Sequence, residues 1–183
     1  TMGLNDSDAW EKMIFVHSGA AAPWEPLERY EAAQTFQDAL NSTTMTMAWD
    51  GEHFWSASGG SSGGERLARY DADGEVLDRF ALNQDYRSIF TIPGDGNLYS
   101  RRYNSREIRR LNNNRDAWED HVTLDGGNLS SQSSVVFDPV GELFLAASSG
   151  TITTWSVDGA LQGTLELNGY GDQPAEGGSV QSR

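Results

Sequence analysis

The sequence contains no cysteine and a single lysine, Lys12, among its 183 residues. Without thiols the chain can form neither disulfides nor thiolate metal sites, and it has no cysteine nucleophile. Its apolar runs are also short, whereas a membrane-spanning helix needs about 20 consecutive apolar residues. Residues 1–6 lack the basic start and apolar run of a signal peptide. We therefore expect a soluble protein without membrane insertion, and the sequence leaves its compartment open.

Positive charge is scarce as well, because the formal net charge is −14 and the estimated pI is 4.4. Such a surface repels nucleic acids and anionic membranes on average, so we expect no nucleic-acid partner. Hydrophobic residues nevertheless make up 37% of the chain and aromatic residues 10%. This apolar content is sufficient for a folded core and argues against global disorder.

The chain repeats itself with a period of 42–45 residues. The turn glycines Gly51, Gly96 and Gly141 lie between two apolar runs in residues 47–55, 92–99 and 136–144, and they are spaced 45 apart. A second landmark, a closing leucine, occurs at steps of 42, 42 and 43, at Leu40, Leu82, Leu124 and Leu167. These landmarks predict repeat units at about 10–40, 45–82, 87–124 and 133–167 within a single domain spanning 1–183.

Each unit has the pattern of short β-strands joined by hairpins. Residues 53–58 and 143–148 are apolar enough for buried inner strands, and residues 66–70 alternate between polar and apolar side chains. Asp-Gly dipeptides suit the tight turns between strands, and turn aspartates such as Asp50, Asp95 and Asp138 are expected to bind nearby backbone N–H groups. The repeat argues against a helix within residues 27–40.

A four-stranded meander cannot cover its own apolar faces, whereas radial stacking of such sheets covers them. We therefore predict an all-β protein, a β-propeller of about four four-stranded antiparallel blades. A β-sandwich is the competing architecture, but it has no reason to repeat a whole meander at constant period. Residues 168–183 correspond to the opening strand of a further blade, or to a strand that closes the ring. An incomplete or partner-completed ring, including a homo-oligomer, is therefore an alternative to closure.

The segments FDPVGELFLA and LARYDADGEVLDRFAL resemble the β-propeller group that includes NHL repeats, YVTN repeats and gluconolactonase-like hydrolases. The resemblance extends from about Trp10 to Leu167 and is specific for the fold rather than for the function. It implies that a hydrolase of this group would hold calcium near the axis, where weak candidates for ligands are Asp85, Asp125 and Asp172. These residues do not match that group's pattern position by position, so no cofactor is the first expectation.

An arginine-rich segment at residues 101–110 stands out in this acidic chain. Arginine binds carboxylate and phosphate groups bidentately and stacks on aromatic rings, so this segment is a candidate anion- or partner-binding patch. The alternative is that these arginines pair with acidic residues of neighbouring blades or of a second subunit. The candidate binding residues are Arg101, Arg102, Tyr103, Arg106, Trp24 and Tyr86.

No catalytic constellation is evident. The histidines His17, His53 and His121 fall at different positions of three separate units, and the glycine- and serine-rich residues 59–64 lack a following lysine. We therefore expect a non-catalytic propeller module that binds a protein or a small polar or anionic ligand through loops on one face. The alternatives are a calcium-dependent hydrolase or lyase of the gluconolactonase-like class and a structural unit completed by another chain.

Overall fold

The computed structural model describes residues 36–40, 44–60 and 64–166. Contacts divide the chain into the units Thr1–Gln37 and Asp38–Arg183, and the following description concerns the second unit. It contains three four-stranded antiparallel sheets, each built from strands that are consecutive in the sequence. The described part of the chain has no helix, so none of it has the length and apolar character to span a bilayer as a helix.

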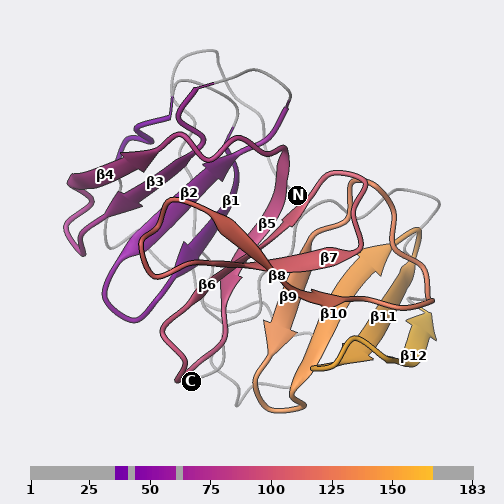
Figure 1. The fold of residues 1–183 in the computed structure, drawn as a ribbon. Coiled ribbons are helices and arrows are strands. Elements are labelled where there is room, and N and C mark those ends of the chain that lie inside the picture. The colour runs from indigo at the N-terminus through magenta and orange to yellow at the C-terminus, as the bar shows by residue number, and fades with distance from the viewer. Residues whose placement is uncertain (1–35, 41–43, 61–63, 167–183) are drawn as a thin grey trace, which may run out of the picture. The chain divides into compact units, whose positions relative to one another are not determined.

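The three sheets are called blades 1, 2 and 3 (Figure 1). Blade 1 consists of β1 (Thr44–Trp49), β2 (Phe54–Ser58), β3 (Leu67–Tyr70) and β4 (Val76–Phe80). Blade 2 consists of β5 (Tyr86–Thr91), β6 (Leu98–Arg102), β7 (Glu107–Leu111) and β8 (Trp118–Thr123). Blade 3 consists of β9 (Val135–Asp138), β10 (Leu143–Ser148), β11 (Thr151–Ser156) and β12 (Leu161–Glu166).

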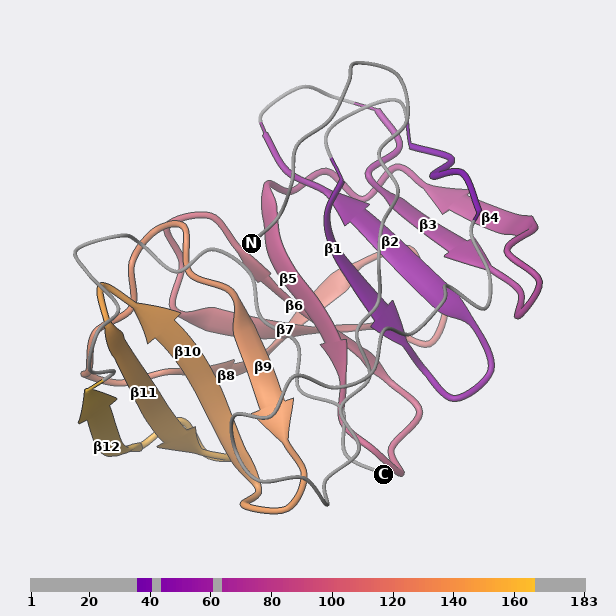
Figure 2. The ribbon, with the colours of Figure 1, turned by 180° about the vertical axis from the view of Figure 1, so that it is seen from behind.

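The first strands of the blades lie side by side, as the front and back views both show (Figures 1 and 2). β5 packs against β1 on one side and against β9 on the other. Hydroxyl groups connect these strands: Thr46 Oγ1 accepts the N–H of Ile89 at 3.2 Å, and Ser88 Oγ accepts the N–H of Val135 at 3.1 Å. The radial order of meanders is that of a β-propeller, and the described strands form an open arc of its ring.

The position of two predicted inner strands needs correction. Residues 53–58 and 143–148 contain the buried strands β2 and β10, but these are second in their sheets. The innermost strands are β1, β5 and β9, whose sequences are less continuously apolar. Second strands are buried because they have a paired strand on each side and a neighbouring blade against their face, so hydrophobicity alone did not identify the axis.

Apolar side chains fill the space between successive blades. Between blades 1 and 2, Trp55 and Leu67 belong to one core cluster with Leu98, Leu111 and Trp118. The second cluster, between blades 2 and 3, contains aromatic pairs with ring centroids 5.5–6.1 Å apart, formed by Phe90, Tyr99, Phe137 and Phe144. Burying each such side chain contributes about 1.5–3 kcal/mol, so packing between blades supplies much of the stability.

Turn aspartates shape the first hairpin of every blade, as predicted. Asp50 Oδ1 accepts the N–H groups of Glu52 and His53 at 2.9 and 2.7 Å. Asp95 Oδ1 accepts the N–H of Asn97 at 2.8 Å. Asp138 accepts the N–H groups of Val140 and Gly141 at 3.0 and 3.2 Å. The repeated aspartates therefore serve the turns themselves.

The first predicted unit, at 10–40, and the segment 168–183 lie almost wholly outside the described residues. Residues 36–40 are described and contain no helix. The landmark Leu40 is 6% exposed, and the corresponding Leu124 is completely buried between blades 2 and 3. Both leucines are therefore buried, and the boundaries of the repeat units stay a prediction.

We predict that Gly159→Ala destabilises the protein far more than Gly150→Ala. Both glycines have positive φ angles, of 86° and 77°, so both substitutions carry the conformational cost of about 1–2 kcal/mol for a side chain in this region. Only at Gly159 would the added methyl group also overlap the carbonyl oxygen of Thr123, whereas Gly150 has open space. Urea denaturation of the two variants measures the difference, and equal losses would contradict this packing.

Candidate ligand-binding pocket

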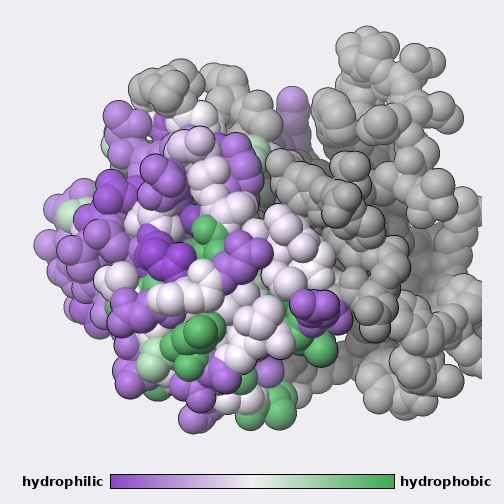
Figure 3. Space-filling model, turned by 90° about the vertical axis from the view of Figure 1, so that its right-hand side faces the viewer, coloured by the Kyte–Doolittle hydropathy of each residue, from purple (hydrophilic) through white to green (hydrophobic). Residues whose placement is uncertain are grey.

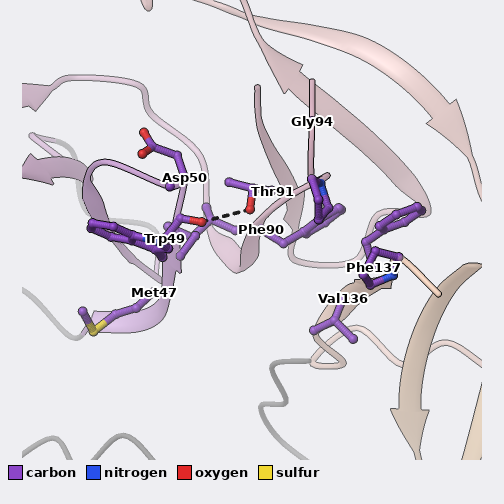
Figure 4. Close-up of a pocket in the computed structure, with 13 residues that line it drawn as sticks. Met47, Trp49, Asp50, Phe90, Thr91, Gly94, Val136 and Phe137 are labelled. Atoms are coloured by element: carbon purple, nitrogen blue, oxygen red, sulfur yellow. Dashed lines mark hydrogen bonds between the residues drawn. The ribbon is translucent and has the colours of Figure 1, made fainter. Parts of the chain in front are cut away.

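A pocket with a volume of about 330 Å³ lies where the first strands of the three blades enter their hairpins. Figure 4 shows Met47 and Trp49 on one side, Phe90 and Thr91 in the middle, and Phe137 opposite. The remaining lining residues come from the same strands and hairpins: Ala48, Asp50, Gly51, Ile89, Pro93, Gly94, Val136 and Pro139. The volume lies at the lower end of the range for small-molecule sites, which is about 300–1,000 Å³.

The walls of this pocket are held in place by contacts within and between the blades. Thr91 Oγ1 donates a hydrogen bond of 3.0 Å to the carbonyl oxygen of Trp49, which joins β5 to β1 (Figure 4). The Trp49 ring lies 4.5 Å from the Phe54 ring, measured between centroids. Phe90 packs edge to face on Phe144, and Phe144 packs on Phe137 in the same way. These contacts give the pocket preformed aromatic walls.

Asp50 is a charged residue of the lining, and its oxygens are already occupied. Besides the two turn N–H groups, it accepts the indole N–H of Trp55 at 2.8 Å, and His53 Nδ1 lies 3.4 Å away. Burial opposes ionisation, but these hydrogen bonds outweigh it, so the pKa of Asp50 lies below its usual value of 3.8. Asp50 is therefore a fixed negative charge that shapes the rim.

The chemistry that this pocket offers is mainly apolar contact. Its polar side chains are those of Asp50 and Thr91, and both already make the hydrogen bonds described above. Across the described residues, no group of three or more His, Asp and Glu side chains could hold a metal ion. The pocket therefore has the composition of a binding site for an apolar or aromatic group.

Arg101, a predicted ligand-binding residue, lies inside the protein with 1% of its surface exposed. Its Nε donates to the carbonyl oxygen of Ser105 at 2.7 Å, and its terminal nitrogens donate to those of Ser130 at 2.8 Å and of Ser133. Burial, with smaller contributions from Arg106 and Arg87, lowers the pKa of Arg101 to about 10. Arg101 thus connects blade 2 to the loop that leads into β9.

The other predicted residues of this segment are not brought together around one cavity. Arg102 is exposed and forms an ion pair of 3.1 Å with Glu107, while Arg106 Nε donates to the carbonyl oxygen of Leu124 at 2.6 Å. Tyr103 is exposed, and its ring lies 5.0 Å from the Arg87 guanidinium carbon. An anion- or partner-binding role for this segment stays a prediction.

The arginines of this segment were expected to pair with acidic residues of neighbouring blades. This expectation is wrong for the ion pairs of the segment, which form within blade 2. Arg102–Glu107, Arg109–Asp120 and Arg110–Glu119 each join strands of blade 2. The physical reason is that arginines on β6 and β7 lie directly opposite acidic residues on the adjacent strand, at the distance that an ion pair requires. Sequence position alone did not specify this strand register.

The remaining candidates occupy separate places. Tyr86 is buried, donates to the carbonyl oxygen of Leu82 at 3.0 Å and accepts the indole N–H of Trp118 at 2.9 Å. Asp85 accepts the N–H of Gly60 at 2.6 Å and pairs with Arg87 at 3.1 Å, whereas Asp125 is exposed. Trp24, Asp172 and His17 lie outside the described residues. The pKa of His121 is lowered by burial and by the nearby Arg110.

Sequence reasoning did not predict the pocket, although its signal was present. The three aligned hairpins mark the repeat, and each places an apolar run on both sides of a turn. Aligning them as parts of one ring would have placed Trp49, Pro93 and Pro139 near one another. The depth of the pocket depends on side-chain packing between blades, which the alignment does not contain.

Comparison with known proteins supports the fold only. No family model matches the chain, and the search of curated proteins found no match. Glutaminyl cyclase from Myxococcus xanthus, a β-propeller-like fold, aligns with a TM-score of 0.54 and 11% identity over 68% of this chain and 53% of that one. Hydrazine synthase from Kuenenia stuttgartiensis aligns with a TM-score of 0.46 and 12% identity over 68% of this chain and 37% of that one. The chain thus spans about half the length of the cyclase.

We predict that Arg101→Met destabilises the protein and that Arg102→Met does not. Removing the Arg101 guanidinium leaves the carbonyl groups of Ser130 and Ser133 without its hydrogen bonds, at a cost of about 1–3 kcal/mol for each buried group. The exposed Arg102–Glu107 ion pair contributes below about 1 kcal/mol. Urea denaturation followed by tryptophan fluorescence measures both free energies of unfolding. Equal stability of the two variants would contradict the structural role of Arg101.

We also predict that Asp50 makes the stability of the protein dependent on acidic pH. Because its folded-state pKa lies below the usual 3.8, the carboxylate contributes its full stabilisation above the unfolded-state pKa. This contribution is lost as the pH falls through the folded-state pKa. Asp50→Asn should therefore destabilise the protein at neutral pH, and the difference from the wild type should shrink in acid. Unfolding free energies measured along a pH series test this, and a constant difference would contradict it.

Proposed function

We propose that this chain is a propeller module that binds an apolar or aromatic group of its ligand in the pocket between β1, β5 and β9. The observation that carries this proposal is the convergence of Trp49, Phe90 and Phe137 on one preformed pocket. Each comes from a different blade, and each is positioned by aromatic contacts outside the pocket or by the adjoining blade. Such a site needs little rearrangement to receive a planar or branched apolar group.

The charge of the protein favours an uncharged or cationic ligand group. The chain carries a formal net charge of −14, and the carboxylate of Asp50 stands at the rim of the pocket. A field of this sign attracts cations and repels anions, and dissolved salt weakens it. A tryptophan, tyrosine or aliphatic side chain of a partner protein fits this description, as does a small amine with an aromatic ring.

This proposal narrows the expectation drawn from the sequence. A protein partner is still consistent with the proposal. An anionic ligand at the arginine-rich segment would bind at a different place and is a separate hypothesis. The donors of Arg101 that were described above already bind carbonyl groups of the protein, which leaves less capacity for a ligand there. The calcium-dependent hydrolase and the unit completed by another chain stay predictions, and no specific contact within the pocket favours either over binding.

Three probes that share one ring and differ in charge test the proposal: tryptamine, indole and indole-3-acetate. Each probe is titrated into the protein while its amide chemical shifts are recorded. The shifts of Ile89, Phe90, Val136 and Phe137 should change most. We expect tryptamine to bind at least as tightly as indole, and indole-3-acetate to bind most weakly. The differences should shrink as salt is added, because salt screens the charges.

Two substitutions provide the matched comparison. Trp49→Ala removes an aromatic wall and should weaken indole binding by ~5-fold or more, about the effect of losing one aromatic contact. Val140 lies on the neighbouring β9–β10 hairpin, is 85% exposed and does not line the pocket. Val140→Ala should therefore leave the affinity for indole unchanged. Shifts scattered over the surface, or equal affinities for all three probes at low salt, would overturn the proposal.

A further inference from the structure

One face of blade 3 is apolar and has no described strand packed against it. In β9 and β10, Val135, Phe137, Phe144 and Ala146 face blade 2. Because side chains alternate along a strand, their neighbours point to the opposite face. The strand register places these neighbours together, since Leu145 pairs with Val136 and Ile152 with Ala147. We call this surface, made of Val136, Leu143, Leu145, Ala147, Ile152 and Leu165, the open face of blade 3.

The five residues of the open face on β9–β11 are half-buried, whereas Leu165 on β12 is 62% exposed. Figure 3, which views the molecule from the side of blade 3, shows green hydrophobic patches among purple residues. Blades 1 and 2 cover their corresponding faces with the first strand of the next blade, because β5 packs on β1 and β9 on β5. The open face of blade 3 therefore fits the first strand of another blade.

A dipeptide recurs at each of these strand-to-strand contacts. It has a hydroxyl residue followed by an apolar one: Thr46-Met47 in β1, Ser88-Ile89 in β5 and Ser134-Val135 at the start of β9. At both contacts the hydroxyl of one strand accepts the N–H of the apolar residue in the next. That apolar side chain is then buried toward the preceding blade, with Ile89 3% and Val135 0% exposed.

A dipeptide of the same kind, Ser179-Val180, lies beyond the described residues. It follows Ser134-Val135 by 45 residues, as the hairpin glycines predict. Residues 124–134 connect β8 to β9, and residues 167–178 provide a connection of similar length from β12 to Ser179. Ser134 Oγ donates to the carbonyl oxygen of Arg87 at 2.8 Å, so its lone pairs remain to accept another N–H group.

We propose that residues 178–183 dock on the open face of blade 3 as the first strand of a further blade. Val180 donates its N–H to Ser134 Oγ, and its side chain packs beside Val136 and Leu145. Ser179 then presents its hydroxyl away from blade 3, as Ser88 does in β5. The occupant is thus a segment of this chain, recognised by one hydrogen bond and one apolar side chain.

The test uses the full chain and two neighbouring substitutions that introduce the same charge. Val180→Asp should lower the melting temperature by ~3 °C or more, because it places a carboxylate against apolar side chains. Gln181→Asp should leave the melting temperature within ~1 °C of the wild type, because alternation points residue 181 away from blade 3. Neither substitution alters a described residue, so a lower melting temperature reports on docking.

Amide hydrogen exchange provides the second measurement. The Val180 amide should exchange ~10-fold or more slowly than a free peptide amide, and Ser134→Ala should abolish this protection. Ser131→Ala, three residues earlier, is the control that should preserve it. An unprotected Val180 amide, or equal melting of Val180→Asp and Gln181→Asp, would overturn the proposal.

A second copy of the chain is the alternative occupant, and it has a distinct signature. The protein would then sediment as a dimer that Leu145→Asp dissociates and Val180→Asp leaves intact. That outcome would also overturn the proposal, whereas a monomer that melts at lower temperature with Val180→Asp would support it.

Discussion

A four-stranded meander has two faces, and apolar side chains on both faces need a neighbour. This constraint organises the described structure, because each blade is stable only through the blades beside it. Blade 2 satisfies the constraint on both sides, with one core cluster toward blade 1 and another toward blade 3. Its first strand, β5, is buried over residues 86–90 as a result. Blades 1 and 3 each have one neighbour within the described strands, and this asymmetry identifies the open face of blade 3.

The pocket is a consequence of the same packing. First strands that pack side by side bring three hairpins to one end of the axis, and the residues entering those hairpins form a concave wall. The turn aspartates fix the hairpins by accepting backbone N–H groups, so the rim is rigid without additional secondary structure. Stability and ligand binding therefore depend on the same contacts, and substitutions that loosen the blades should also alter the pocket.

Arginine side chains make many of the hydrogen bonds and ion pairs that stabilise this fold. Only one of the 13 basic residues is lysine, and the buried Arg101 shows what arginine provides. Its planar guanidinium reaches carbonyl groups in several directions at once, which the single ammonium of lysine cannot do with the same geometry. The hydrogen bonds offset the cost of burying the charge. The exposed arginines of blade 2 instead pair with acidic residues on adjacent strands.

The sequence by itself determined the all-β meanders and the role of the turn aspartates. These features follow from alternation along a strand and from hydrogen bonds within a few residues, both of which are local. The tertiary structure alone decided that β1, β5 and β9 are innermost, that Arg101 is buried and that Trp49, Phe90 and Phe137 share a pocket. The physical reason is that these features depend on contacts between residues far apart in the sequence, such as Arg101 with Ser133, 32 residues away, and Thr91 with Trp49, 42 residues away. Local patterning specifies each blade but not which side chains meet between blades.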